Sequence, residues 1–219
     1  MVSDTRGKLL DGAIASLRDN GSAGVSARVI AATAGVNQAL IFYHFGSVSE
    51  LIDAACRYAA AEQVAVYRPR FEVVSSLREL LVLGQELHAS QREAGNVAVL
   101  AQVLAGARYD SRLAGAAQSA LLLWAGEIES TLRRLLAGTP VAEVADAAAL
   151  APVVTAAFIG IELYEGADPD GAAAAFVALD QLSVLIEVFD ELGPVARRAV
   201  RSRIRRARAS SHTRRSAPA

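Results

Sequence analysis

The chain has few residues that bind metals or form cross-links. Its 219 residues include one cysteine, one methionine, one tryptophan and three histidines. The single Cys56 excludes an internal disulfide and is typical of a reducing cytoplasm. The cysteine and the histidines (His44, His88 and His212) do not stand at metal-ligand spacing. We therefore expect no cofactor, no metal and a cytoplasmic location.

We expect neither a signal sequence nor a membrane-spanning run. Asp4, Arg6 and Lys8 interrupt the start of the chain before an apolar core could form. The longest uncharged run, residues 147–161, has 15 residues and contains Pro152. A membrane span needs about 20 residues, so a buried helix is the better interpretation. We expect no membrane partner.

Strand alternation, phosphate-binding loops and nucleophile triads are also lacking. Apolar residues make up 53% of the chain, alanine dominates, and aromatic residues amount to 5%. Alanine-rich segments with few prolines favour helices throughout. We predict an all-α protein of about nine helices: an N-terminal three-helix head and a C-terminal antiparallel helical bundle. No arrangement of side chains suggests an enzyme.

The segment 26–45, SARVIAATAGVNQALIFYHF, has the pattern of two short helices joined by a tight turn. Ser26 and Asn37 are typical helix caps, because a side-chain oxygen can accept a backbone N–H of the first turn. Gly35 stands where the turn needs a positive φ. Small and apolar residues occupy the offsets that a helix-turn-helix requires: Ile30, Ala31, Ala34, Val36, Ile41 and Phe45. An ordinary helical hairpin is the alternative, and the agreement of all positions favours DNA binding.

Amphipathic spacing and capping residues predict further helices along the chain. Ser47 and Glu50 form a capping box, Pro69 should end the helix that follows, and Asn96 should cap another. The expected ranges are 5–20, 27–34, 38–44, 47–68, 73–94, 96–107, 110–136, 146–164 and 170–190. We divide the chain into a DNA-binding head (1–52), a ligand-binding and dimerisation domain (53–193) and an arginine-rich tail (194–219).

The net charge of −1 conceals a strong asymmetry. Residues 194–219 contain nine arginines and no acid, whereas residues 1–193 hold 13 basic and 23 acidic residues, a net charge of −10. Residues 1–52 carry four charges of each sign, which is unusual for a DNA-binding unit. The tail could supply the missing non-specific DNA affinity, or it could be a solvated end without a role.

The segment 26–51 resembles the DNA-binding head of TetR-type transcriptional regulators. The resemblance rests on these groups: Ile30-Ala31, Ala34-Gly35-Val36, Ile41, Phe42-Tyr43-His44-Phe45 and Glu50-Leu51. It implies a homodimer in which each head places one helix in the major groove of a palindromic operator. It also implies that a small ligand in the C-terminal domain releases the DNA.

The same resemblance implies roles for individual side chains. Arg28 and Gln38 would reach base edges, where arginine can read guanine and glutamine can read adenine. The complete predicted DNA-binding set is Ser26, Arg28, Asn37, Gln38, Ala39, Leu40, Phe42, Tyr43, His44 and Ser47, with Ala39 and Phe42 against thymine methyls and Ser26, Tyr43 and His44 at or near phosphates. The alternative for Arg28 and Gln38 is ordinary solvated helix surface.

The chain departs from the family pattern at three positions. Phe42 replaces a usual tyrosine, Val48 a phosphate-binding lysine, and Leu40 a small polar residue. We therefore predict fewer direct phosphate contacts than the family norm. The N-terminus of the helix after Ser47 could still offer backbone N–H groups to a phosphate.

Polar and aromatic residues on the apolar faces of the C-terminal helices are the candidates for ligand contact, with ordinary packing or exposure as the alternative for each. They are His88, Gln102, Tyr109, Gln118, Trp124, Glu127, Phe158 and Tyr164. Residues 147–161 and 172–189 are too apolar for exposure, so we expect them to form a four-helix homodimer interface. An intramolecular core is the alternative.

We interpret the chain as a ligand-responsive regulator, a repressor that binds double-stranded DNA as a homodimer and responds to a small-molecule effector. The alternative function is a helical ligand-binding or protein-interaction module with weak or lost DNA binding.

Overall fold

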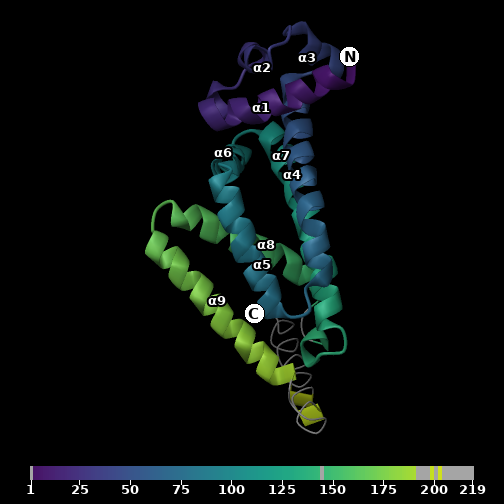
Figure 1. Cartoon of the computed structure of the whole chain (residues 1–219), viewed down its shortest axis with the longest axis vertical. Coiled ribbons are helices and arrows are strands. Elements are labelled where there is room, and N and C mark those ends of the chain that lie inside the picture. Colours follow the sequence, from purple (N-terminus) through teal and green to yellow (C-terminus); the bar gives the residue numbers. More distant parts are fainter. Residues whose placement is uncertain (1, 144–145, 191–197, 200–201, 204–219) are drawn as a thin grey trace, which may run out of the picture.

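The computed structural model describes residues 2–143, 146–190, 198–199 and 202–203, and these contain helices and no strand. The all-α prediction is confirmed. The helices are α1 (Val2–Gly24), α2 (Ala27–Ala34), α3 (Ala39–Phe45), α4 (Val48–Val73), α5 (Leu77–Glu93), α6 (Asn96–Ala107), α7 (Ser111–Leu136), the 3₁₀ turn η1 (Pro140–Glu143), α8 (Ala147–Glu165) and α9 (Pro169–Asp190). A small head made of α1, α2 and α3 sits at one end of an elongated helical domain (Figure 1).

The head closes around a dry apolar core. Its buried residues come from α1, α2, α3 and the first two turns of α4: Leu9, Leu10, Ala13, Ile30, Ala31, Ile41, Leu51 and Ala55. Ile30 and Ile41 are fully buried, as the helix-turn-helix pattern predicted. Ala55 lies beyond residue 52, so α4 belongs to both the head and the domain below it.

Local chemistry fixes the two short helices of the head. The Ser26 hydroxyl accepts the N–H of Val29 at 3.3 Å, and the Asn37 carboxamide oxygen accepts the N–H of Ala39 at 2.8 Å. Gly35 ends α2 with φ 64° and ψ 34°, a left-handed conformation that suits glycine. The predicted caps and turn are therefore present, with each helix boundary within one residue of its expected position.

Gly12 allows α1 and α2 to approach each other closely. A Cβ atom on this glycine would lie 2.8 Å from the Cβ of Ala34. Because such a distance is not tolerated between carbon atoms, any side chain here would push the two helices apart.

The prediction that Pro69 ends the fourth helix is wrong: α4 continues to Val73. The proline removes one backbone donor, yet Tyr67, Phe71 and Val74 on either side of it are buried and hold the last turn in place. The Arg134 guanidinium from α7 also donates to the carbonyl oxygens of Phe71, at 2.7 Å, and of Val74. Burial and this long-range cap outweigh the local cost of the proline.

Three other boundaries differ from the predictions. Helix α1 extends to Gly24, with a non-helical residue at Gly21 (φ 68°, ψ 170°). Asn96 does not cap α6, because Gly95 precedes the helix and the Asn96 side chain bonds other helices instead. Helix α5 begins at Leu77, four residues later than expected, with the Ser76 hydroxyl accepting the N–H of Glu79.

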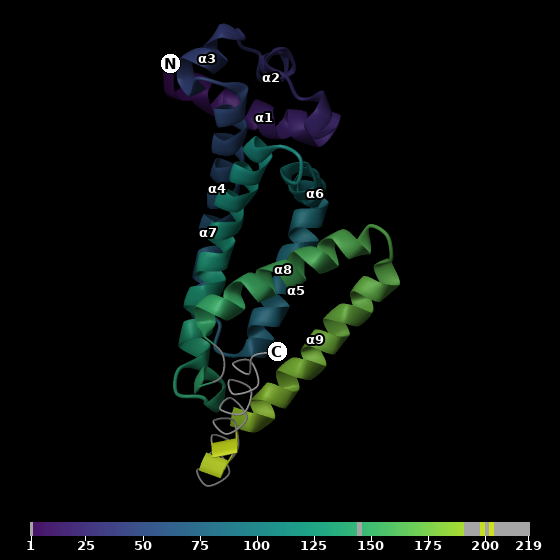
Figure 2. The ribbon, with the colours of Figure 1, turned by 180° about the vertical axis from the view of Figure 1, so that it is seen from behind.

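The long helices α4 and α7 lie side by side along the molecule, and α6 runs beneath α1 (Figure 2). A junction core joins head and domain, with Leu17 of α1 against Cys56 of α4 and Val99 and Val103 of α6. Lower down, a second core gathers aromatic rings between α4, α5, α7 and α8: Tyr67, Phe71, Trp124 and Phe158.

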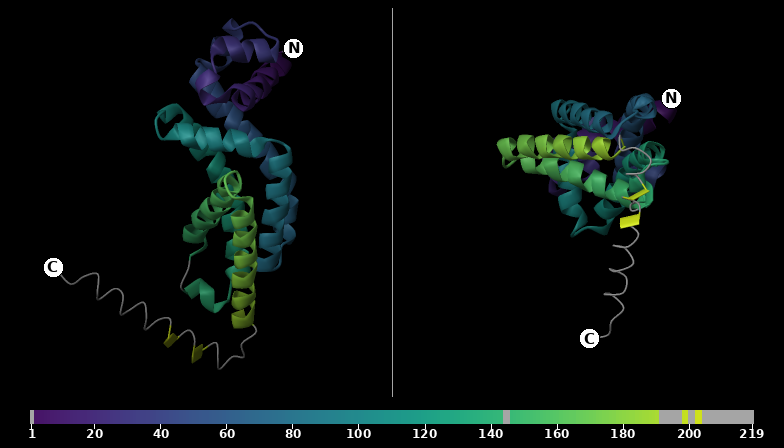
Figure 3. Two further views of the ribbon diagram at one scale, coloured as in Figure 1. Left: turned by 90° about the vertical axis from the view of Figure 1, so that its left-hand side faces the viewer. Right: turned by 90° about the horizontal axis from the view of Figure 1, so that it is seen from below.

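Helices α8 and α9 form an antiparallel pair on one side of the domain (Figure 3). Both expose large apolar side chains: Val153, Leu163 and Tyr164 on α8, and Val177, Leu182 and Val184 on α9. Helix α8 is also, among the described helices, the one long and apolar enough to cross a membrane by length and composition. Its buried side packs on α7 and carries Thr155 and Glu162, whereas its outer side is apolar and open.

Candidate functional site

The outer face of the head presents the predicted DNA-binding residues. Ser26, Arg28, Asn37, Gln38 and Ala39 are exposed. Phe42 is 50% exposed and Tyr43 79% exposed, although both are aromatic. Apolar rings left open on a helix whose opposite side is buried indicate a contact surface.

Three of the predicted DNA-binding residues are less exposed to solvent. Leu40 is half-buried and packs against the head core. His44 is half-buried, with its ring edge-on to Tyr43 at a centroid distance of 4.9 Å. Ser47 is half-buried and caps α4, accepting the N–H of Glu50 at 3.1 Å.

The N-terminus of α4 is less available to a phosphate than its sequence indicates. The Ser47 hydroxyl donates to the Glu50 carboxylate at 3.0 Å, so a negative charge already lies beside this helix end. Because a carboxylate repels a phosphate, this helix end is a weaker anion site than the sequence predicted.

A chain of hydrogen bonds connects the head with the domain below it. The Arg18 guanidinium of α1 donates to Asn96 at 3.3 Å, and the Asn96 carboxamide donates to Gln91 of α5 at 2.8 Å. Gln91 in turn donates to Gln63 of α4 at 2.9 Å. These hydrogen bonds hold the head against α4, α5 and α6.

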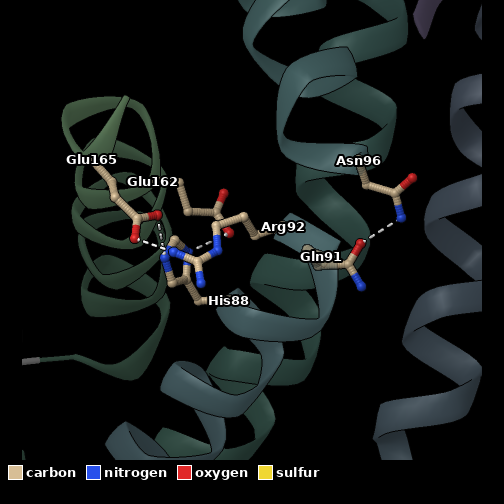
Figure 4. A network of polar contacts seen from close by, with 6 residues as sticks. All are labelled: His88, Gln91, Arg92, Asn96, Glu162 and Glu165. Carbon is tan, nitrogen blue, oxygen red and sulfur yellow. Dashed lines mark hydrogen bonds and ion pairs between the residues drawn. The ribbon is translucent and has the colours of Figure 1, made fainter. Parts of the chain in front are cut away.

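Charged side chains of α5 and α8 come together in the domain, with Arg92 on the exposed side of the group (Figure 4). His88 and Glu162 are 7% and 6% exposed. The His88 Nε2 atom lies 2.8 Å from Glu165 Oε2, and Nδ1 lies 3.5 Å from Glu162 Oε1. Arg92 also binds Glu165, at 2.7 Å. Burial raises the pKa of the Glu162 carboxyl, and nearby His88 lowers it in part.

Two aromatic rings border this group. The His88 ring lies 6.2 Å from the Phe158 ring and 5.5 Å from the Phe176 ring of α9, measured between centroids. The Nδ1 atom of His88 is buried and has no hydrogen-bond partner. The cluster, which we call the His88 cluster, consists of His88, Arg92, Phe158, Glu162, Glu165 and Phe176.

Residues 9–55 match the family model of the bacterial regulatory proteins of the tetR family. This match covers the helices and the open face described above. The head of the chain is of the tetR family of bacterial regulatory proteins. The resemblance of the head to this family is confirmed, and the match supports a DNA-binding role for the head.

Solved structures extend the likeness over most of the chain. A protein described as a TetR-family transcriptional regulator, from Rhodococcus sp., is 22% identical with a TM-score of 0.68, covering 84% of this chain and 98% of its own. A protein described as a transcriptional regulator from Saccharomonospora viridis, solved with choline, is 22% identical with a TM-score of 0.62, covering 82% and 95%. The multidrug binding protein EbrR, solved with imidazole, is 27% identical with a TM-score of 0.58, covering 81% and 94%. None of the curated proteins matches the chain.

The TetR-family fold brings three of the predicted ligand residues into one region. His88 and Phe158 belong to the His88 cluster, and Trp124 lies in the adjoining core against Tyr67 and Phe71, at 6.3 and 6.5 Å. Glu127 lies apart and binds Arg68 at 2.8 Å. Gln102 lies at the junction core, where its buried Oε1 atom has no hydrogen-bond partner.

The other predicted ligand residues face outwards. Tyr109 is 91% exposed, Tyr164 is 53% exposed and Gln118 is exposed. Sequence reasoning missed Glu162, Glu165, Arg92 and Phe176. A signal for Glu162 was present, since it follows Ala151, Thr155 and Phe158 at helical spacing on the side of α8 that packs inwards.

Proposed function

We propose that this TetR-family regulator binds a two-fold symmetric operator as a homodimer, represses transcription, and is released by a small-molecule effector. The open face of α3 carries the proposal: Gln38, Ala39, Phe42 and Tyr43 project from a helix whose buried side is fixed by Ile41. A rigid helix with exposed polar and aromatic groups suits reading of the major groove. The proposed location is the cytoplasm, and no catalytic role is assigned.

The proposed dimer surface is the outer side of α8 and α9. Val153, Val177 and Leu182 are 61%, 58% and 54% exposed, which a symmetric contact with a second copy would cover. We expect a dimer in sedimentation at micromolar concentration. A monomer at that concentration would contradict this part of the proposal.

The effector is proposed to bind inside the domain, where polar groups are buried among aromatic side chains. Two proteins of the same fold were solved in complex with small molecules, one with choline and one with imidazole. Those ligands are not assigned to this chain. The hydrogen bonds from Arg18 through Asn96 to Gln91 would transmit effector binding to the head. Movement of α5 or α6 would disturb these bonds and change the position of the head.

Selection of bound sites from random DNA, with the full-length protein, tests the proposal. We expect a palindromic site. Gln38→Ala should reduce discrimination at one base position of each half-site by about 1–3 kcal/mol, because an amide that reads a base edge is lost. Tyr43→Phe is the matched control, since loss of a phosphate contact should weaken all sequences alike. Unchanged base preference in Gln38→Ala would contradict the assigned reading face.

A helical binding module without DNA binding is the second candidate. It is favoured by the balanced charge of residues 1–52 and by the Glu50 carboxylate at the start of α4. Absence of any gel shift at low salt, with DNA flanking its own gene, would select this candidate.

The arginine-rich tail lies almost wholly outside the described residues, and its contribution to DNA affinity remains our hypothesis. Deletion of residues 194–219 should lower operator affinity and flatten its salt dependence, because arginine–phosphate contacts release counterions. An unchanged slope of affinity against salt concentration would remove the tail from the DNA-binding surface.

A further inference from the structure

The His88 cluster holds a buried ring nitrogen without a hydrogen bond, beside a buried carboxylate. Nε2 of His88 lies 2.8 Å from a Glu165 oxygen, so this nitrogen must donate. In a neutral imidazole the other nitrogen, Nδ1, is then an acceptor. It lies 3.5 Å from Glu162 Oε1, which is also an acceptor when the carboxyl is ionised. When His88 is neutral and Glu162 is ionised, these two atoms therefore face each other without a donor between them, and a donor placed beside them would satisfy both.

The two carboxylates differ in how well they are compensated. Glu165 binds both Arg92, at 2.7 Å, and His88, at 2.8 Å. Glu162 is more deeply buried than Glu165, and its basic neighbour in the described part of the chain is His88 at 3.5 Å, which carries a positive charge only when it is protonated. A buried carboxylate without a full positive partner is costly, so positive charge at this point would be favourable.

Aromatic rings stand beside the under-compensated carboxylate. Phe158 and Phe176 lie 6.3 Å apart between centroids, on α8 and α9, and both face the His88 ring. The faces of such rings attract organic cations and accept their alkyl groups. An anion would be repelled by the Glu162 carboxylate, and a neutral alcohol would leave the charge of Glu162 uncompensated.

We infer that the His88 cluster is the effector site and that it binds an organic ammonium ion. The N–H groups of the ion bond Nδ1 of His88 and the Glu162 carboxylate, and its alkyl part lies against Phe158 and Phe176. The inference rests on the proposed function and names the class of effector. Because the same ion contacts α5, α8 and α9, it can shift α5, which is bonded through Gln91 and Asn96 to Arg18 of the head.

The test compares three probes of similar size and different charge on the full-length protein at pH 7.5. Calorimetric titration is carried out with n-hexylammonium chloride, 1-hexanol and sodium hexanoate. We expect hexylammonium to bind at least about tenfold more tightly than hexanol, because a charged hydrogen bond is added, and hexanoate not to bind. Equal affinity for hexylammonium and hexanol, or no binding of hexylammonium, would overturn the inference.

Two variants assign the site. Glu162→Gln should lose about tenfold or more in hexylammonium affinity. The control, Glu86→Gln, removes an exposed carboxylate of the same helix as His88, paired with Arg70, and should leave the affinity unchanged. Circular dichroism confirms that each variant is folded. Full affinity in folded Glu162→Gln would overturn the assignment.

Gel shift with the selected operator separates the two proposals. If the protein binds the operator and hexylammonium does not bind the protein, the ammonium inference fails and the proposed function stands. If no DNA is bound under any condition, the proposed function fails whatever the calorimetry gives. Release of the operator by hexylammonium in the wild type, and its loss in Glu162→Gln, supports both.

Discussion

The head and the domain below it bury different kinds of side chain. The head core is formed by eight buried apolar residues, with the hydroxyl of Ser16 buried beside them, whereas the domain also buries the ionisable side chains His88 and Glu162. Burial of apolar groups is favourable and needs no compensating charge. Buried charges are costly unless something compensates them, so the domain retains a cost that a ligand can relieve. The comparison indicates a rigid reading unit above a domain that responds to binding.

The largest expected effect is in the head core. Ile41→Ala should lower the free energy of unfolding by about 2–5 kcal/mol, because Ile41 is fully buried in a dry core. Denaturant unfolding measures the loss, and Val66→Ala, on an exposed side of α4, is the control with a change within about 0.5 kcal/mol. A small loss of unfolding free energy in Ile41→Ala would mean that the head core is loosely packed around this side chain.

A smaller effect is expected from the turn between α2 and α3. Gly35→Ala should cost about 1–2 kcal/mol, since φ at this position is +64° and a Cβ is strained there even though space is open around it. Gly115→Ala lies inside α7 with nothing nearby and should stabilise by about 0.5–1 kcal/mol. Thermal unfolding of both variants checks the opposite signs. Equal changes in thermal stability for the two variants would contradict the role assigned to the positive φ of Gly35 in the turn.

The interior charge of the domain should appear in the pH dependence of stability. Burial raises the pKa of Glu162 above its ordinary value of 4.5, so the folded state retains a proton that the unfolded state releases. The carboxyl therefore adds most stability below pH 4.5, and this contribution is lost as pH rises through the folded-state pKa.

Glu162→Gln removes that dependence. Relative to the wild type, the variant should gain stability as pH increases above 4.5, reaching a difference on the order of 1 kcal/mol. Unfolding curves measured from pH 4 to pH 8 give the difference. A wild type that gains stability over the variant at high pH would show that His88 fully compensates the carboxylate and would remove the contrast between the two regions.

The smallest effect concerns the junction core between the regions. Cys56 is buried against Leu17, and burial raises the pKa of its thiol to about 11. The thiol stays protonated at pH 8, so a thiol reagent should modify it only after unfolding. Colorimetric thiol titration, with and without denaturant, checks this. Rapid modification of the native protein would show that the head swings away from the domain.

The sequence predicted the head more accurately than the domain, for a physical reason. Ser26, Gly35 and Asn37 act on neighbours within a few residues, so local chemistry alone sets α2, α3 and their turn. Pro69 shows the limit of such reasoning, because Arg134, more than sixty residues away, helps to complete the end of α4. Asn96 shows it again, since contacts with Arg18 and Gln91 replace the predicted cap.

What the sequence by itself determined is the helical class, the helix-turn-helix and the exposed face of α3. These follow from caps, spacing and glycine, which act over short stretches of chain. What the tertiary structure decided is where charge is buried. Glu162, His88 and Phe176 lie on three separate helices, and only their packing places a carboxylate, an imidazole and an aromatic ring in one interior cluster. Burial depends on elements far apart in the chain, so no local pattern could assign it.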